Sequence, residues 1–207
     1  KRQPVLISNQ LFMRILPLFL AFIVFGASAQ LLKKEETGQL KFRHIGPIGN
    51  RVSCAIGLPG NDLVYFAGAA TGGLWKTTDG GLSWKPLLDD KSVASVSALA
   101  AAPSDPQVIY AGTGESFIRS NVSIGNGVYR STDGGDSWQH IGLDNTGRIS
   151  RILVHPTNPD VVFVAAVGHA YAPQKERGLY KSTDGGKNWK QVLFVDDNTG
   201  ISDMVMD

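Results

Sequence analysis

One eleven-residue phrase occurs three times in this chain. It reads LWKTTDGGLSW at residues 74–84, VYRSTDGGDSW at 128–138 and LYKSTDGGKNW at 179–189. The central aspartates of successive copies are 54 and 51 residues apart. Self-similarity at a nearly fixed period of this size is typical of repeat architectures, in which one supersecondary unit stacks on the next.

Each copy of the phrase predicts a β-hairpin. Its apolar and aromatic residues favour a strand. In the turn, an Asp side chain can accept hydrogen bonds from downstream backbone N–H groups, and glycine allows positive φ. A catalytic or calcium-binding group is usually needed once, so residues that recur in every copy are expected to build the repeat. They are Asp79, Gly81, Trp84, Asp133, Gly135, Trp138, Asp184, Gly186 and Trp189.

The phrase resembles the Asp box, or BNR repeat, whose pattern is Ser/Thr-x-Asp-x-Gly-x-Thr/Ser-Trp. All three copies fit, except that Asn188 stands at the Ser/Thr position of the third. Asp boxes occur in sialidases, xyloglucanase-type glycosidases, sortilin/Vps10 receptors and photosystem II assembly factors, all of them β-propellers. The resemblance implies a propeller whose boxes are structural hairpins far from the ligand site. The style of the repeat is also similar to that of large bacterial secreted proteins labelled glycosyl hydrolase, which implies an N-terminal fragment of such a protein.

Aligning the copies shows four strands in each repeat. The second strands, at 63–68, 108–113 and 161–166, are apolar throughout, as expected of strands buried between neighbouring sheets. Four antiparallel strands about every 50 residues fit a propeller blade. We therefore expect an all-β fold, a β-propeller built of four-stranded antiparallel blades. Three complete blades are expected at about residues 51–88, 95–143 and 148–196, with the start of a fourth at 200–207.

Residues 40–46 are similar to residues 136–142, which form the outermost strand of a predicted blade. No blade precedes this segment, so we expect it to complete the last blade of the ring. The partial propeller would then span residues 40–207. The rest of the propeller, beyond residue 207, would then be a partner of the part described by this sequence, and residues 40–46 would pair with its last blade.

Residues 13–29 read as a secretory signal peptide. Arg14 is the positive n-region, residues 15–25 are the apolar core, and residues 27–29 form an Ala-x-Ala cleavage site before Gln30. The core is too short to span a bilayer. Residues 1–29 would be removed, residues 1–12 would lie upstream of a true start at Met13, and residues 30–39 would form a linker. We expect a secreted or periplasmic protein; an uncleaved anchor is the alternative.

The composition narrows the range of partners. The net charge of +2 does not favour nucleic acid or a membrane surface. A single cysteine allows no intrachain disulfide, and the four histidines show no metal-ligand spacing. We expect neither a metal nor a cofactor.

The loops at 113–127 and 168–178 differ most between repeats, and they lie on the face opposite the aspartate turns. Binding groups concentrate on variable loops of a rigid scaffold. The candidate ligand-binding residues are Arg51, Glu115, Arg119, Arg148, His169, Glu176 and Arg177. Guanidinium groups there suit a carboxylate or an acidic glycan. In the alternative interpretation, Glu115 only orients its loop, and Glu176 and Arg177 form a solvated pair.

Two functions fit this sequence. One is a binding scaffold for a protein or glycan; the other is a sialidase- or xyloglucanase-type glycoside hydrolase with catalytic carboxylates partly outside the chain. Glycosidases usually need two carboxylates about 5–10 Å apart. The resemblance to xyloglucanases implies an acid before a Thr-Gly-Gly stretch of the first blade, where this chain has Ala70. No catalytic residue is assigned, and the binding scaffold is preferred.

Overall fold

The computed structural model describes residues 46–47 and 51–207. The expected signal peptide, linker and, apart from Gly46, the strand at 40–46 lie outside the described residues. Within the described part of the chain, no helix is both long and apolar enough to cross a membrane.

Three four-stranded antiparallel sheets make up nearly all of the described structure, and each is a simple meander in chain order. We call them blades 1, 2 and 3, and the β-propeller prediction is confirmed. Blade 1 holds β1 (Val52–Leu58), β2 (Asn61–Ala69), β3 (Leu74–Thr77) and β4 (Lys85–Pro86). Blade 2 holds β5 (Val96–Ala102), β6 (Asp105–Thr113), β7 (Val128–Ser131) and β8 (Gln139–His140). A 3-10 turn, η1 (Asp144–Thr146), leads to blade 3, with β9 (Ile149–His155), β10 (Asn158–Ala166), β11 (Gly178–Ser182) and β12 (Lys190–Leu193).

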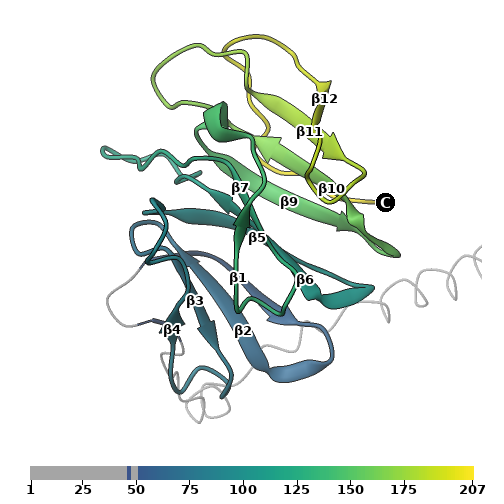
Figure 1. Cartoon of the computed structure of the whole chain (residues 1–207). Coiled ribbons are helices and arrows are strands. Elements are labelled where there is room, and N and C mark those ends of the chain that lie inside the picture. The colour runs from purple at the N-terminus through teal and green to yellow at the C-terminus, as the bar shows by residue number, and fades with distance from the viewer. Residues whose placement is uncertain (1–45, 48–50) are drawn as a thin grey trace, which may run out of the picture. The chain divides into compact units, whose positions relative to one another are not determined.

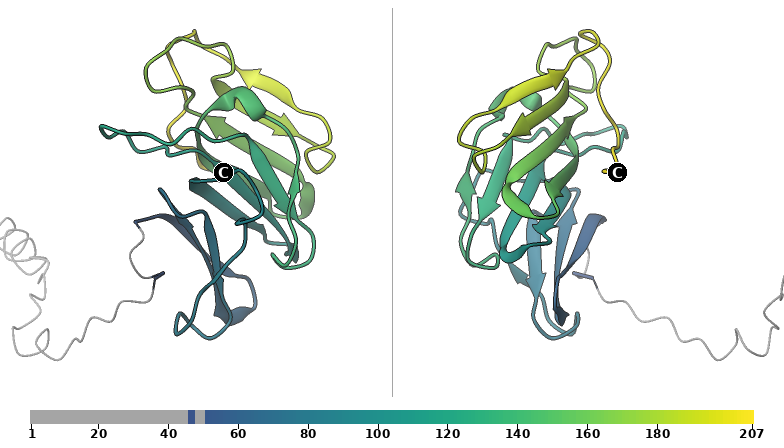
Figure 2. Two further views of the ribbon diagram at one scale, coloured as in Figure 1. Left: turned by 60° about the vertical axis from the view of Figure 1, so that its left-hand side comes forward. Right: turned by 90° about the vertical axis from the view of Figure 1, so that its right-hand side faces the viewer.

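The blades stack in chain order, with blade 2 between its neighbours (Figures 1 and 2). The first strand of blade 2, β5, contacts both β1 and β9. The loop that joins β6 to β7 projects from the sheets (Figure 2). This stacking buries the two faces of the middle blade and leaves the loops at the edges of the sheets accessible.

Two hydrophobic clusters fill the junctions between the blades. Consecutive residues of β6 enter different clusters, because successive side chains of a strand point to opposite faces. Ile109 packs in the cluster that includes Phe66 of blade 1, whereas Tyr110 packs in the cluster that includes Val162 of blade 3. The continuous apolar run of the second strand is thus explained by burial on both faces.

In blades 1 and 3, a serine of the first strand bonds to the main chain of the segment that follows the blade. The Ser53 hydroxyl donates to the Val96 carbonyl of the next blade at 2.7 Å. The Ser150 hydroxyl donates in the same way to the Ile201 carbonyl at 2.7 Å. Residues 200–207 form no strand, yet Ile201 is held beside blade 3 as Val96 is held beside blade 1.

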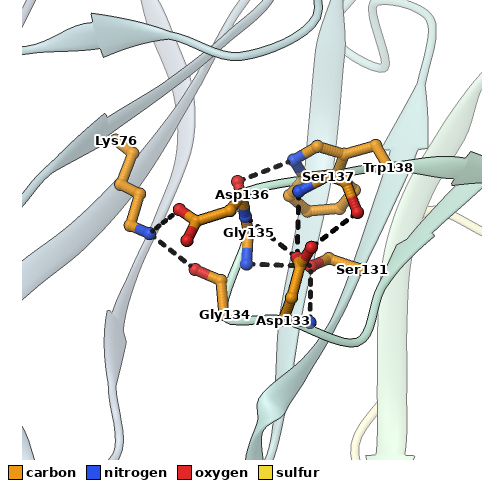
Figure 3. Close-up of polar contacts among 8 residues, drawn as sticks. All are labelled: Lys76, Ser131, Asp133, Gly134, Gly135, Asp136, Ser137 and Trp138. Atoms are coloured by element: carbon orange, nitrogen blue, oxygen red, sulfur yellow. Dashed lines mark hydrogen bonds and ion pairs between the residues drawn. The ribbon is translucent and has the colours of Figure 1, made fainter.

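The three turns at residues 77–84, 131–138 and 182–189, here called the aspartate turns, fold around their own carboxylates. In the second turn, the Ser137 N–H donates to Asp133 Oδ1 at 2.9 Å, and the Ser137 hydroxyl donates to Oδ2. The Ser131 hydroxyl donates to the same carboxylate at 2.7 Å and accepts the Gly135 N–H at 2.8 Å (Figure 3). The carboxylate is therefore occupied by groups of its own turn.

The third turn keeps this pattern although its sequence departs from it. Asn188 replaces the Ser of the other copies, and its Nδ2 donates to Asp184 Oδ2 at 2.7 Å. Its backbone N–H donates to Oδ1 at 2.9 Å. An amide NH₂ group supplies the donor that a hydroxyl supplies elsewhere, so the replacement preserves the turn.

We expect Gly135→Ala to destabilise the protein much more than Gly60→Ala. Both glycines have positive φ, 88° and 79°, so the backbone strain is shared. A Cβ at Gly135 would lie 2.5 Å from Phe66 Cε1 of blade 1, whereas one at Gly60 would meet nothing within 4 Å. The difference should be about 1–3 kcal/mol, the usual cost of overpacking. Equal losses of unfolding free energy in urea would show that the turn does not pack in the junction.

Acid should weaken the aspartate turns. The hydroxyl of Ser137 lowers the pKa of Asp133 to about 2, and the side-chain amide of Asn188 lowers that of Asp184 to about 2. The unfolded value is about 3.9, so this stabilisation is present above pH 4 and is lost as the pH falls through 2. At neutral pH, Asp133→Ala should cost about 1–3 kcal/mol. That difference from the parent protein should shrink between pH 4 and pH 2 in urea unfolding; a constant difference would contradict the assignment.

Candidate functional site

Glu115, in the loop after β6, is buried and ion-paired. Its side chain is 2% exposed and accepts a hydrogen bond from Arg119 Nε, and Arg51 Nη2 lies 3.6 Å from the same carboxylate oxygen. The hydrogen bond from Arg119 lowers the pKa of Glu115, although burial opposes this shift. The carboxylate is thus held ionised and is poorly suited to donate a proton as a general acid.

Arg148 and Arg177 are also buried, 2% and 6% exposed. The Arg148 Nε donates to the Gly168 carbonyl at 2.6 Å. Desolvation, with the charge of Arg177 nearby, lowers the pKa of Arg148. Arg177 binds four main-chain oxygens, those of Val167, His169, Ala172 and Asp197. Both guanidinium groups therefore hold the loop at 168–178 through main-chain carbonyls.

The loop at 168–178 is joined to its surroundings by Gln174, which the sequence interpretation did not single out, and by Tyr171. The Gln174 amide accepts the His169 N–H and donates to the Asn145 carbonyl at 2.8 Å. The Tyr171 hydroxyl donates to the Arg119 carbonyl at 3.0 Å, which links this loop to the loop at 113–127. Glu176 is exposed, and among the described residues its one hydrogen bond is a long one of 3.4 Å from Gln174.

The first strands of the three blades line a groove of about 770 Å³. Phe117 and Ile118 border this groove and are 65% and 73% exposed. The loop that carries them is tied to β5, because the Ser116 N–H donates to the Ser97 hydroxyl at 3.1 Å. The sequence interpretation did not single out Phe117 and Ile118, although apolar residues in a Gly/Ser-rich loop are a signal that could have found this surface.

A smaller pocket of about 120 Å³ lies beside the groove and shares Phe117 and Ile118 with it. Arg51, Glu115 and Ala70 line this pocket. The Arg51 side chain is 59% exposed. Of the predicted arginines, Arg51 alone combines a largely exposed guanidinium with a place at the pocket.

The candidate residues thus fall into two groups. Arg51, Glu115 and Arg119 lie together at the pocket. His169, Glu176 and Arg177 belong to the loop at 168–178, and Arg148, just before β9, contacts that loop. Among the described residues, no group of three or more His, Cys, Asp or Glu could hold a metal ion. The site offers an apolar surface, the accessible Arg51 side chain at the pocket and an ionised carboxylate behind it.

The chain matches one protein-family model over more than half of its length. A family model described as sortilin, neurotensin receptor 3 (Sortilin-Vps10) matches residues 72–199. The match covers parts of all three blades and all three aspartate turns.

Curated relatives include enzymes and an assembly factor. A xyloglucanase from Paenibacillus sp is 30% identical over 156 residues, which cover 69% of this chain and 14% of the relative. The photosystem II assembly lipoprotein Ycf48 from Synechococcus sp. (strain CC9902) is 33% identical over 100 residues, or 48% of this chain and 26% of the relative. The chain thus spans about a quarter or less of the length of these two relatives.

Solved structures agree on the architecture. An ancestral GH74 enzyme is 27% identical, with a TM-score of 0.57, over 73% of this chain and 20% of its own. The GH74 xyloglucanase from Xanthomonas campestris is 21% identical, with a TM-score of 0.51, over 70% of this chain and 21% of its own. The second likeness concerns the fold alone.

Arg177→Met should loosen the loop at 168–178 while leaving the strands intact. The replacement keeps an apolar stem but removes the donors for four carbonyls. Hydrogen–deuterium exchange of the loop should accelerate at least tenfold, because buried acceptors left unpaired favour local opening. Glu176→Gln, one residue away and exposed, is the control. Unchanged loop exchange in Arg177→Met would contradict the role assigned to the guanidinium.

Proposed function

Because the chain belongs to the Sortilin-Vps10 family, we propose that it is part of a secreted or periplasmic propeller that binds a protein or glycan ligand. The loop face, with Arg51, Phe117 and Ile118, is the proposed binding surface. The aspartate turns are proposed to be Asp boxes with a structural role. The relatives support a propeller scaffold related to glycoside hydrolases.

One observation carries this proposal. Arg51 presents a largely exposed side chain in a pocket that it shares with Phe117 and Ile118, and these two exposed apolar residues also border the groove. Glu115 lies behind Arg51 at 3.6 Å and orients it without covering it. A planar guanidinium binds carboxylates bidentately, so an acidic group on the ligand fits this place.

The opposite face supports the same choice. The carboxylates of the aspartate turns accept hydrogen bonds from their own Ser and Asn side chains and backbone N–H groups. A carboxylate satisfied in this way has little capacity left for a ligand. The turns are therefore better suited to hold the blades than to bind a ligand.

A glycoside hydrolase is the second candidate, favoured by the likeness to xyloglucanases and to a GH74 enzyme. Such an activity would require carboxylates outside the described residues. Glu115 is ionised and paired with arginine, and buried Ala70 lies at the place where the xyloglucanase resemblance implies an acid. We therefore expect no xyloglucanase activity from these three blades.

Arg51→Ala should weaken ligand binding about 10- to 100-fold, the effect of losing a charge-assisted hydrogen bond. Binding would be screened on an array of acidic and neutral glycans and on a peptide library, and affinities of the hits measured by calorimetry. Lys187→Ala, on an exposed aspartate turn, is the matched control and should bind normally.

Hydrolysis of the same glycans would be followed in Glu115→Gln and Glu176→Gln variants. Binding lost in Arg51→Ala without turnover in the parent protein supports the scaffold. Turnover that disappears in either glutamine variant would favour the hydrolase instead. Binding lost only on changing Lys187 would place the ligand on the opposite face.

A further inference from the structure

Each blade carries a cation on its third strand, at the position before the aspartate turn. This cation lies over an aromatic ring of the second strand in its own blade. The pairs are Lys76 over Phe66 at 5.7 Å, Arg130 over Tyr110 at 5.6 Å and Lys181 over Phe163 at 5.1 Å from the ring centroid.

At the junction of blades 1 and 2, the same cation reaches the neighbouring aspartate turn. Lys76 Nζ donates to the Gly134 carbonyl at 2.8 Å and to the Asp136 carboxylate at 2.8 Å (Figure 3). The lysine side chain is only 15% exposed, so this contact is partly shielded from solvent. Lys76 therefore recognises one carbonyl and one acid of the next blade.

The junction of blades 2 and 3 repeats the contact with different residues. Arg130 Nη1 donates to the Gly185 carbonyl at 3.4 Å, and Gly185 is the counterpart of Gly134. Arg130 Nη2 donates to the Asp160 carboxylate at 2.6 Å. The acid now comes from the start of β10 instead of the turn, yet each junction has one carbonyl and one acid.

On blade 3, Lys181 lies over an aromatic ring as the other two cations do. Within the described part of the chain, it has a stacking partner in Phe163 and no acceptor corresponding to Gly134 or Gly185. A surface hollow of about 440 Å³ lies beside it, lined in part by Trp189 and Val192. Val192 is 42% exposed, whereas its counterpart in blade 2, Ile141, packs into the junction cluster.

We propose that Lys181 is the docking residue for a further blade of this protein, one that carries another aspartate turn. The first glycine of that turn would supply the carbonyl, and an acidic side chain of the same blade would supply the carboxylate. The second glycine of the turn would pack on Val192, as Gly186 packs on Ile141. Ile201, held by Ser150, already lies where the first strand of such a blade would run.

A second copy of this chain fits the surface poorly. Its accessible aspartate turn would be that of blade 1, where Leu82 and Leu63 occupy the positions of Asp136 and Asp160. The two leucines are 74% and 57% exposed. Blade 1 therefore offers Lys181 no acid at either of these two positions, and the exposed leucines there suit a neighbour without a cation at the position of Lys181. The charge pattern favours a further acidic blade over head-to-tail association.

The test compares melting temperatures in the 207-residue chain and in the natural protein extended through the following blade. In the shorter chain, Lys76→Gln should lower the melting temperature on the order of 5 °C. Lys181→Gln should change it no more than Lys175→Gln, an exposed control in the loop at 168–178. In the extended protein, Lys181→Gln should cost as much as Lys76→Gln.

Three results would overturn the proposal. One is a natural protein with no further aspartate turn after residue 207. Another is an extended protein in which Lys181→Gln and Lys175→Gln have the same melting temperature. The last is a 207-residue chain that light scattering shows to be a dimer and that Lys181→Gln converts to a monomer, since the occupant would then be a second copy.

Discussion

The packing of the aspartate turns between blades is the constraint on which the rest of this structure depends. A four-stranded sheet with an apolar second strand has to cover both of its faces. The turn makes this possible because its own side chains satisfy its carboxylate, which leaves the second glycine to lie against the preceding blade. At Gly135 and Gly186, a Cβ would lie within 2.5 Å of Phe66 and Ile141. The closeness of the blades thus follows from a local hydrogen-bond network.

The loops at 113–127 and 168–178, which form the loop face, are held in place by this scaffold. Three charged side chains stabilise the loops. Glu115 and Arg119 form an ion pair within the loop at 113–127, and Arg177 donates to main-chain carbonyls in and beside the loop at 168–178. This arrangement keeps Phe117, Ile118 and Arg51 accessible on a fixed background. A surface held in this way is suited to recognition, because little conformational freedom is lost on binding.

The fold could be predicted from the sequence because it is built of local, repeated signals. The Asp-Gly-Gly turn, the apolar second strands and the period of about 50 residues each act within one repeat. The structural role of Arg148 and Arg177 could not be predicted, because it depends on main-chain carbonyls that are distant in the sequence. Arg177 donates to the carbonyl of Asp197, twenty residues away. An arginine in a variable loop looks the same in the sequence whether its guanidinium contacts a ligand or a carbonyl. The apolar residues Phe117 and Ile118 were visible in the sequence, but their exposure depends on how Ser97 holds the loop.

Hydrogen exchange at the turn amides tests the central claim most directly. The N–H groups of Gly135 and Gly186 donate to Ser131 and Ser182 and are buried in the junctions. If the turns hold the blades together, these two amides should exchange only through global unfolding, at the rate of the β6 core amides. Exchange of Gly135 and Gly186 through local opening, well below the global unfolding free energy, would show that the blades stack without the turns.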